Sequence, residues 1–213
     1  MNITRYQDNH FFYFWKPAGI PSTFGKEKSF LDVILSSKDR QISDIVLYLK
    51  DMFTQKQEYG LLNRLDNDTS WLLYFAKNSL IKNKYKLAQS EWKIIKYYIA
   101  DVYWDFTQDS QKISHPIWHH KFSDDRMVVF LEKQQSTKID IKRLNYVETE
   151  VQKLYYDDIS NTSTLLVKIS KWIRHQIRAH LSSIWYPVVG EKIYIRKKSR
   201  EKLHLFSIWL QRL

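Results

Sequence analysis

The sequence predicts an α+β domain built around a largely antiparallel sheet. Segments typical of strands outnumber segments typical of helices, and their order is not the regular strand–helix alternation of a parallel sheet. Of the 213 residues, 44% are hydrophobic and 15% are aromatic, which is enough for a buried core and argues against a disordered chain. We therefore expect one domain that spans residues 1–213.

The first elements follow from local patterns near the N-terminus. The aromatic run Phe11–Trp15 is typical of a strand, and it stops at the turn Lys16–Gly19, which contains proline and glycine. Apolar residues at helical spacing predict a helix over 42–56. The apolar run 72–76 predicts a buried strand.

The remaining elements are read in the same way. The polar segment 79–91 predicts a helix, and segment 94–103, rich in β-branched and aromatic residues, predicts a strand. A further helix is expected over 173–184. The other expected strands cover 127–131, 146–155, 164–169 and 203–210.

The charge of the chain favours a polyanionic partner. Lys and Arg outnumber Asp and Glu by 34 to 23, which gives a net charge of +11. The basic excess is concentrated in 77–96 and 168–202. Nucleic acid is the first expectation for such a chain, although a basic surface serves solubility as well, and charge alone does not separate RNA, DNA and anionic lipid.

Several classes of protein are disfavoured by composition. There is no cysteine, so disulfides and thiolate metal sites are excluded. No apolar run has the length of a membrane span, and residues 1–10 lack the apolar core of a secretory signal. We therefore expect a cytoplasmic protein that does not enter a membrane.

The segment Asn63–Ser70 carries the first candidate site. Asp66 stands just before the apolar strand 72–76 and two residues after Arg64. A nearby cation can hold such a carboxylate ionised, and the carboxylate can then act as a nucleophile or a base. The same residues also fit a polar turn at the surface.

The segment Arg174–His180 carries the second candidate. In a helix, Arg174 and Arg178 share a face, as do Gln176 and His180. Two arginines on one face form a phosphate clamp or the partner of a buried acid, or simply a solvated basic face. His175 and His180 lack the i, i+4 spacing of helical zinc sites, so no metal is expected.

The segment Lys96–Ala100 is the third candidate. On a strand, residues 96, 98 and 100 share one face. Aromatic side chains among lysines suit RNA, because an exposed ring stacks on an unpaired base. Ordinary packing of strand aromatics in a core is the alternative.

Taken together, the three segments resemble the RluA-like pseudouridine synthases. The resemblance rests on Arg64-Leu65-Asp66 with Thr69-Ser70, on Lys96-x-Tyr98-x-Ala100, and on His175-Gln176-Ile177-Arg178-x-His180, in that order. Lys16–Gly19 and Tyr186–Gly190, followed by Tyr194, agree with it. The resemblance runs from about residue 8 to 210 and implies a mixed, mainly antiparallel sheet flanked by helices. The S4 module of many relatives is not expected here.

The resemblance also implies an activity and residue roles. The chain would convert uridine to pseudouridine in structured ribosomal or transfer RNA, with Asp66 as the catalytic aspartate that attacks the nucleoside. Arg64 would assist base flipping, Tyr98 would stack on the flipped uracil, and Ile177 would lie beneath it. Arg178 would form an ion pair with Asp66. No cofactor, metal or obligatory protein partner is implied, and a monomer is expected.

The sequence departs from the family pattern at three polar positions. Asn63 stands where histidine is common, Ile173 where many relatives have arginine, and Glu191 where aspartate is usual. None of the three removes a catalytic group. A catalytically inactive RNA-binding protein on the same scaffold stays an alternative, while a DNA-binding protein lacks any helix-turn-helix, zinc or zipper signature.

The tryptophans are the largest departure, because there are 8 of them beside only 4 glycines. Trp71, Trp172 and Trp185 stand where the family has glycine, and Trp104, Trp118 and Trp209 fall on common glycine sites. Trp15 and Trp92 have no such assignment. We expect the six to be glycines encoded by UGA and printed as tryptophan by the wrong translation table. Genuine drift in a divergent or inactive relative is the alternative.

Overall fold

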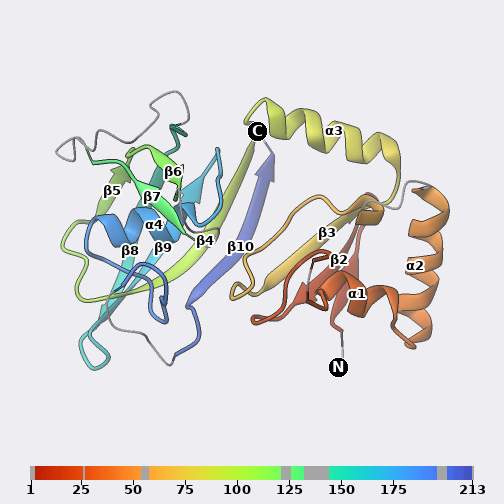
Figure 1. Ribbon diagram of the computed structural model, residues 1–213, viewed down its shortest axis with the longest axis horizontal. Coiled ribbons are helices and arrows are strands. Elements are labelled where there is room, and N and C mark those ends of the chain that lie inside the picture. Colours follow the sequence, from red (N-terminus) through yellow and green to blue (C-terminus); the bar gives the residue numbers. More distant parts are fainter. Residues whose placement is uncertain are drawn as a thin grey trace. The chain divides into compact units, whose positions relative to one another are not determined.

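The computed structural model describes residues 3–25, 27–53, 58–120, 126–131, 144–195 and 201–212, the last four by their backbone only. The chain divides into two compact units, 1–93 and 94–213 (Figure 1).

The first unit is a three-stranded antiparallel sheet with helices packed against it (Figure 1). Its strands are β1 (Arg5–Gln7), β2 (Phe11–Lys16) and β3 (Trp71–Ala76), in the order β1-β2-β3. Its helices are α1 (Phe30–Leu35), α2 (Arg40–Met52), α3 (Ser79–Ser90) and the 3-10 turn η1 (Glu58–Gly60).

The core of this unit follows from the alternation of the strands. Phe12 and Phe14 on β2 and Leu73 and Phe75 on β3 are buried, and they form one cluster with the apolar faces of α1 and α2. The helices begin at side-chain caps, which satisfy backbone N–H groups that have no partner inside the helix. The capping residues are Ser29, Asp39 and Asn78.

The second unit contains a five-stranded antiparallel sheet in the order β10-β4-β9-β8-β5. Its strands are β4 (Ile94–Tyr103), β5 (Ser110–Ile113), β8 (Thr149–Asp157), β9 (Thr162–Ile169) and β10 (Leu205–Arg212). The short pair β6 (Ile117–His119) and β7 (Met127–Val129) forms a separate ribbon. Helix α4 (Gln176–Ser183) belongs to this unit (Figure 1). Its residues Ile177 and Leu181 form one hydrophobic cluster with alternate residues of β9, such as Leu165 and Val167.

The expected fold class is therefore confirmed, with every described strand pairing antiparallel and the strands distributed over three sheets. The long elements match their predicted positions, whereas α1, β1, β5 and β6 were not anticipated. These four have three to six residues each, too few for a periodic pattern to show. Residues 54–56 of the predicted helix 42–56 lie outside the described residues.

One predicted helix begins later than expected, and this changes an inference about its arginines. His175 has a left-handed backbone with φ of 54°, so α4 begins at Gln176 rather than at residue 173. Arg174 consequently lies outside the helix, and the prediction that it shares a helical face with Arg178 is wrong. Among the residues described, no helix has the combination of length and apolar composition needed to cross a bilayer.

Candidate active site

Asp66 lies on the loop that leads into β3, and its neighbours on both sides are held by hydrogen bonds. The hydroxyl of Ser22 donates to the carbonyl of Leu65 over 2.8 Å and accepts from the Leu65 N–H over 2.9 Å. The N–H of Gly19 donates to the carbonyl of Asn67 over 2.8 Å. Asp66 itself is half-buried, and these hydrogen bonds hold the backbone on both sides of it.

Lys16 is a buried cation at the base of this loop. The residue is 0% exposed. Its ammonium donates to three backbone carbonyls, those of Pro17 (2.9 Å), Ile20 (2.8 Å) and Asn67 (3.1 Å). Burial lowers the pKa of Lys16 to about 8, and the negative charges of Asp66 and Asp68 oppose that shift. The Lys16–Gly19 turn therefore supplies a positive charge close to Asp66.

The two polar residues upstream of Asp66, Asn63 and Arg64, lie in different environments. Arg64 is exposed. Asn63 is buried, with its side-chain N–H donating to the carbonyl of Leu72 over 3.1 Å and its side-chain oxygen accepting from the N–H of Tyr74 over 2.8 Å. The residue that replaces the family's common histidine thus anchors the loop to β3 through backbone groups.

Tyr98 and Ile177 meet in one hydrophobic cluster of the second unit. Ile177 on α4 is buried in the cluster, and the half-buried Tyr98 on β4 packs against it. A ring that keeps part of its surface exposed beside an apolar layer is suited to stacking on an unpaired base. The two residues expected at the uracil therefore belong to the same hydrophobic cluster.

Lys96 lies on the same strand as Tyr98 and is covered by an aromatic ring. Its ammonium lies 3.7 Å from the centre of the Trp172 ring, and the residue is 8% exposed. Burial lowers the pKa of Lys96 to about 7. The strand face predicted for RNA contact therefore contains a cation enclosed beneath an indole.

Arg178 forms a buried ion pair with Glu191. Its Nε and Nη2 atoms donate to the two carboxylate oxygens over 2.7 Å each, and the two side chains are 4% and 0% exposed. The N–H groups of Lys192 and Ile193 donate to the same carboxylate. Burial raises the pKa of Glu191, but Arg178 and these N–H groups outweigh it and hold that pKa below its ordinary value.

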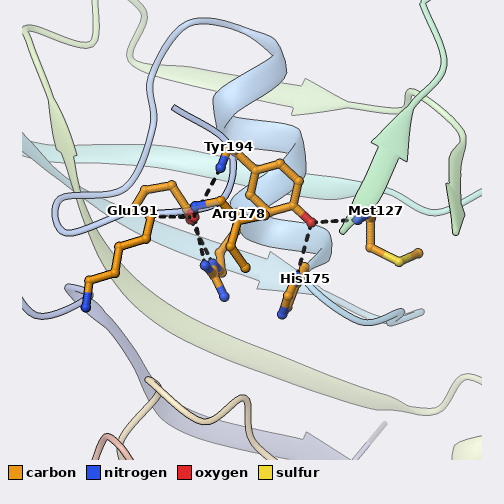
Figure 2. Close-up of polar contacts among 7 residues, drawn as sticks. Met127, His175, Arg178, Glu191 and Tyr194 are labelled. Atoms are coloured by element: carbon orange, nitrogen blue, oxygen red, sulfur yellow. Dashed lines mark hydrogen bonds and ion pairs between the residues drawn. The ribbon is translucent and has the colours of Figure 1, made fainter. Parts of the chain in front are cut away.

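Tyr194 connects this ion pair to its surroundings (Figure 2). Its hydroxyl accepts from the N–H of Met127 over 3.0 Å and lies 3.1 Å from Nδ1 of His175. The guanidinium of Arg178 lies over the Tyr194 ring, 5.8 Å from its centre. Arg178 therefore contacts both the Glu191 carboxylate and the Tyr194 ring.

The other polar residues of α4 attach the helix to β8. Gln176 donates to the hydroxyl of Thr149 over 3.1 Å, and Nδ1 of His180 lies 2.8 Å from the same oxygen. Nε2 of His180 lies 2.8 Å from the carbonyl of His115. Burial lowers the pKa of His180 to about 4, which favours a neutral imidazole engaged in structural hydrogen bonds. The prediction that residues 176 and 180 share a face is confirmed.

Of the five expected site residues, Asp66 and Arg64 lie in the first unit, and Tyr98, Ile177 and Arg178 in the second. Reasoning from the residues missed two contacts, that of Lys16 with the Asp66 loop and that of Glu191 with Arg178. Only the family resemblance carried a signal for them, because it includes the Lys16–Gly19 turn and places Glu191 at an acidic position.

Comparison with known proteins places this geometry in a family. The RNA pseudouridylate synthase family matches residues 10–183. Ribosomal large subunit pseudouridine synthase C of Buchnera aphidicola (subspecies Acyrthosiphon pisum, strain APS) is 28% identical over 199 residues, which cover 91% of this chain and 54% of that protein. Dual-specificity RNA pseudouridine synthase RluA of Pasteurella multocida (strain Pm70) is 24% identical over 197 residues, covering 91% of this chain and 77% of that protein.

The fold comparison agrees. A human structure described as RNA pseudouridylate synthase domain containing 1 superimposes with a TM-score of 0.70 at 20% identity, covering 98% of this chain and 78% of that one. The chain spans about half the length of the first curated relatives it matches. Because the matched region contains Asp66, Tyr98, Ile177 and Arg178 and covers most of the sequence, the chain belongs to the RNA pseudouridylate synthase family.

Proposed function

We propose that the chain converts uridine to pseudouridine in structured RNA, with Asp66 as the catalytic carboxylate. The observation that carries this proposal is the Asp66 loop, in which a half-buried carboxylate lies between neighbours held by Ser22, Gly19 and Lys16. A nucleophile needs this combination of fixed position and access to its substrate. Family membership over residues 10–183 connects the loop to this reaction.

The proposed reaction is an isomerisation that starts with attack by Asp66 on the nucleoside. The bond between the sugar C1′ and uracil N1 breaks, the base rotates, and a new bond forms between C1′ and C5. The bond that Asp66 formed with the nucleoside is broken in the process, which releases the free carboxylate. The proton lost from C5 is balanced by the proton gained at N1. No electrons are exchanged with a redox partner and no outside group is transferred, so we propose no cofactor or metal.

Substrate binding is proposed for the other four residues. The uridine must leave its stack before its glycosidic bond is accessible. We assign Arg64 to flipping, Tyr98 to stacking on the uracil and Ile177 to the apolar layer beneath it. Arg178 is the arginine proposed to serve the catalytic aspartate; Glu191 binds its Nε and Nη2 atoms and so fixes the orientation of its guanidinium plane.

Phosphate binding is proposed for the lysines of α3. Lys84 and Lys86 are exposed, and Lys82 lies one helical turn before Lys86. Burial lowers the pKa of Lys82, with the like charge of Lys86 as the next cause. A helix that gathers like charges at i, i+4 gains stability when an anion binds there.

The substrate proposed is ribosomal or transfer RNA, and the ribosomal large subunit pseudouridine synthases among the relatives support the first of these. We further propose that residues 1–213 function as one catalytic domain, and that the protein acts as a cytoplasmic monomer without an obligatory partner. Activity of the purified chain in a chelating buffer, with its mass in solution measured alongside, tests these points together.

The decisive experiment maps pseudouridine chemically in RNA from a strain that lacks the gene, after incubation with purified protein. Wild type should restore pseudouridine at defined positions, and Asp66→Asn should restore none while RNA binding persists, because phosphate contacts carry most of the affinity. Asp68→Asn is the matched control, since Asp68 lies in the same loop and also faces Lys16. Equal maps for wild type and Asp66→Asn, both lacking pseudouridine, would favour an inactive RNA-binding protein.

A further inference from the structure

Three tryptophans adopt a backbone conformation that suits glycine. Trp92, Trp104 and Trp185 have φ of 57°, 71° and 71°. Three glycines of this chain have φ of 80° to 83°, in the same left-handed region. There the Cβ of any other residue crowds the following carbonyl oxygen, whereas glycine has no Cβ.

The other residues in this region make the tryptophans stand out. In the described part of the chain seven non-glycine residues have positive φ, and three of them are tryptophans. Asn161 and His175 are of types that visit the left-handed region regularly, and Glu58 and Tyr59 are consecutive residues of the turn η1. A bulky residue in this region is an outlier, and the three tryptophans occupy it at three separate places. Chance placement of 8 tryptophans among 213 residues does not favour such a concentration.

The end of α3 shows why the conformation at residue 92 is fixed. The N–H of Trp92 donates to the carbonyl of Gln89 over 3.1 Å, and the N–H of Lys93 donates to that of Ala88 over 2.9 Å. Two such bonds that close the last helical turn define a Schellman motif. Trp92 occupies the left-handed position of this motif, which is usually glycine.

The end of α4 repeats this arrangement. The N–H of Trp185 donates to the carbonyl of Ser182 over 3.2 Å, and the N–H of Tyr186 donates to that of Leu181 over 2.9 Å. Trp185 is again the left-handed residue. Tyr186 and Leu181 also belong to the same hydrophobic cluster, the apolar contact that often accompanies the motif. Helices α3 and α4 therefore both end in a Schellman motif that has tryptophan where glycine is usual.

The backbone N–H and the carbonyl of Trp104 are both hydrogen-bonded. Its N–H donates to the carbonyl of Asn161 over 2.8 Å, and its carbonyl accepts from the hydroxyl of Ser163 over 3.0 Å. Ser163 is fully buried and also accepts from the N–H of Phe106 over 2.8 Å. The backbone at 104 therefore has to leave this network if it is to escape the left-handed region.

The indoles gain little burial in exchange for this conformation. Trp92, Trp104 and Trp185 are 46%, 51% and 83% exposed. A tryptophan stabilises a fold mainly by burying its large surface, and these three leave about half or more of it in solvent. Exposed rings that stack on RNA bases are the competing explanation, and the experiments below separate the two.

We propose that residues 92, 104 and 185 are glycine in the natural protein, encoded by UGA codons that its translation system reads as glycine. One reassigned codon accounts for all three positions and for the excess of tryptophan over glycine. The backbone conformation also adds residue 92 to the expected glycines, a position to which the family resemblance gave no assignment. Trp71, Trp118 and Trp172 do not have positive φ, so their backbone conformation does not support glycine there. For these three positions glycine is expected only if they share the reassigned codon. The side chain of Trp209 lies outside the described residues.

The coding sequence and the mass of the natural protein give the first test. UGA at codons 92, 104 and 185, with peptides lighter by the difference between tryptophan and glycine, is the expected result. UGG codons, or peptides that contain tryptophan, would overturn the proposal. Neither measurement depends on catalysis, so this proposal and the proposed reaction can fail separately.

Thermal unfolding of full-length variants tests the conformational argument. At residues 104 and 185, Trp→Gly should melt higher than Trp→Ala by about 2–8 °C per site, because both remove the ring and only glycine relieves the left-handed backbone. Trp15, which lies on strand β2 and pairs with Leu72 of β3, is the matched control, where Gly should melt lower than Ala. Alanine equal to or better than glycine at 104 and 185 would contradict the argument. If the tryptophan form does not fold, the Gly–Ala comparison still stands.

Discussion

The guanidinium of Arg178 and the carboxylate of Glu191 are joined by two hydrogen bonds of 2.7 Å inside the second unit. Glutamate reaches the arginine here although the family usually has aspartate at this position. Through this pair Arg178 contributes to the stability of the fold in addition to its proposed role in catalysis. The free energy of unfolding measures that contribution separately from turnover.

Arg178→Ala should destabilise the fold by about 3–5 kcal/mol, because it leaves the Glu191 carboxylate buried without its cation. Arg178→Lys should recover part of this loss, since it restores the charge but not the two-pronged geometry. Denaturant unfolding measures both. The double variant Arg178→Ala with Glu191→Gln should be more stable than Arg178→Ala alone. A loss below about 1 kcal/mol for Arg178→Ala, the range of surface pairs, would contradict the prediction.

The stability of the protein should fall in acid through Glu191. Its pKa in the folded chain lies below the ordinary value of 4.5, so the ion pair contributes stability above about pH 4.5 and loses it as the pH falls through the lower folded value. The free-energy difference between wild type and Glu191→Gln should therefore shrink below pH 4.5. A difference that stays constant from neutral pH to well below this value would rule out the pair as its source.

Lys16→Met should destabilise the first unit by about 2–4 kcal/mol, because three carbonyls lose a buried donor. The same variant removes the positive charge beside Asp66, so turnover per folded molecule should fall as well. Unfolding curves and single-turnover rates at low temperature separate the two effects. Lys28→Met, a change at another lysine of the same unit, should change neither quantity appreciably.

Replacing Lys84 and Lys86 by glutamine should weaken RNA binding with little effect on folding, since both are exposed. Loss of two phosphate contacts should reduce the slope of log affinity against log salt by about 1.4–1.8. Lys112→Gln is the control, because the ammonium of Lys112 is already paired with Glu148 at 2.7 Å. Equal slopes for the α3 double variant and the control would place the RNA elsewhere.

Sequence reasoning performed best where a motif is contiguous and worst where a contact joins distant segments. Asp66, Tyr98 and Ile177 are predicted site residues because each lies inside a short motif. The contact between Lys16 and the Asp66 loop was missed because the two segments are about 50 residues apart, and no local pattern links them. The short elements α1, β1, β5 and β6 depend on packing against neighbours rather than on their own periodicity.

Backbone conformation explains the remaining differences. The sequence around Arg174 fits a helix, but the left-handed His175 delays its start, and a sequence pattern does not reveal that. Trp92 had no assignment because a Schellman motif is defined by hydrogen bonds after the helix, not by the letters within it. Trp104 and Trp185 were singled out from family resemblance alone, and only the structure supplies a physical reason.

The hydrogen bond between Lys16 and Asn67 also constrains when the protein becomes competent during folding. The two residues are 51 positions apart, so the chain must first close a long loop, through the pairing of β2 with β3, before the segment around Asp66 can settle. Contacts at such separation form late relative to local helices. A collapsed intermediate that already contains α2 and α3 would therefore still lack an ordered catalytic loop, and catalysis should appear only in the final kinetic phase of refolding.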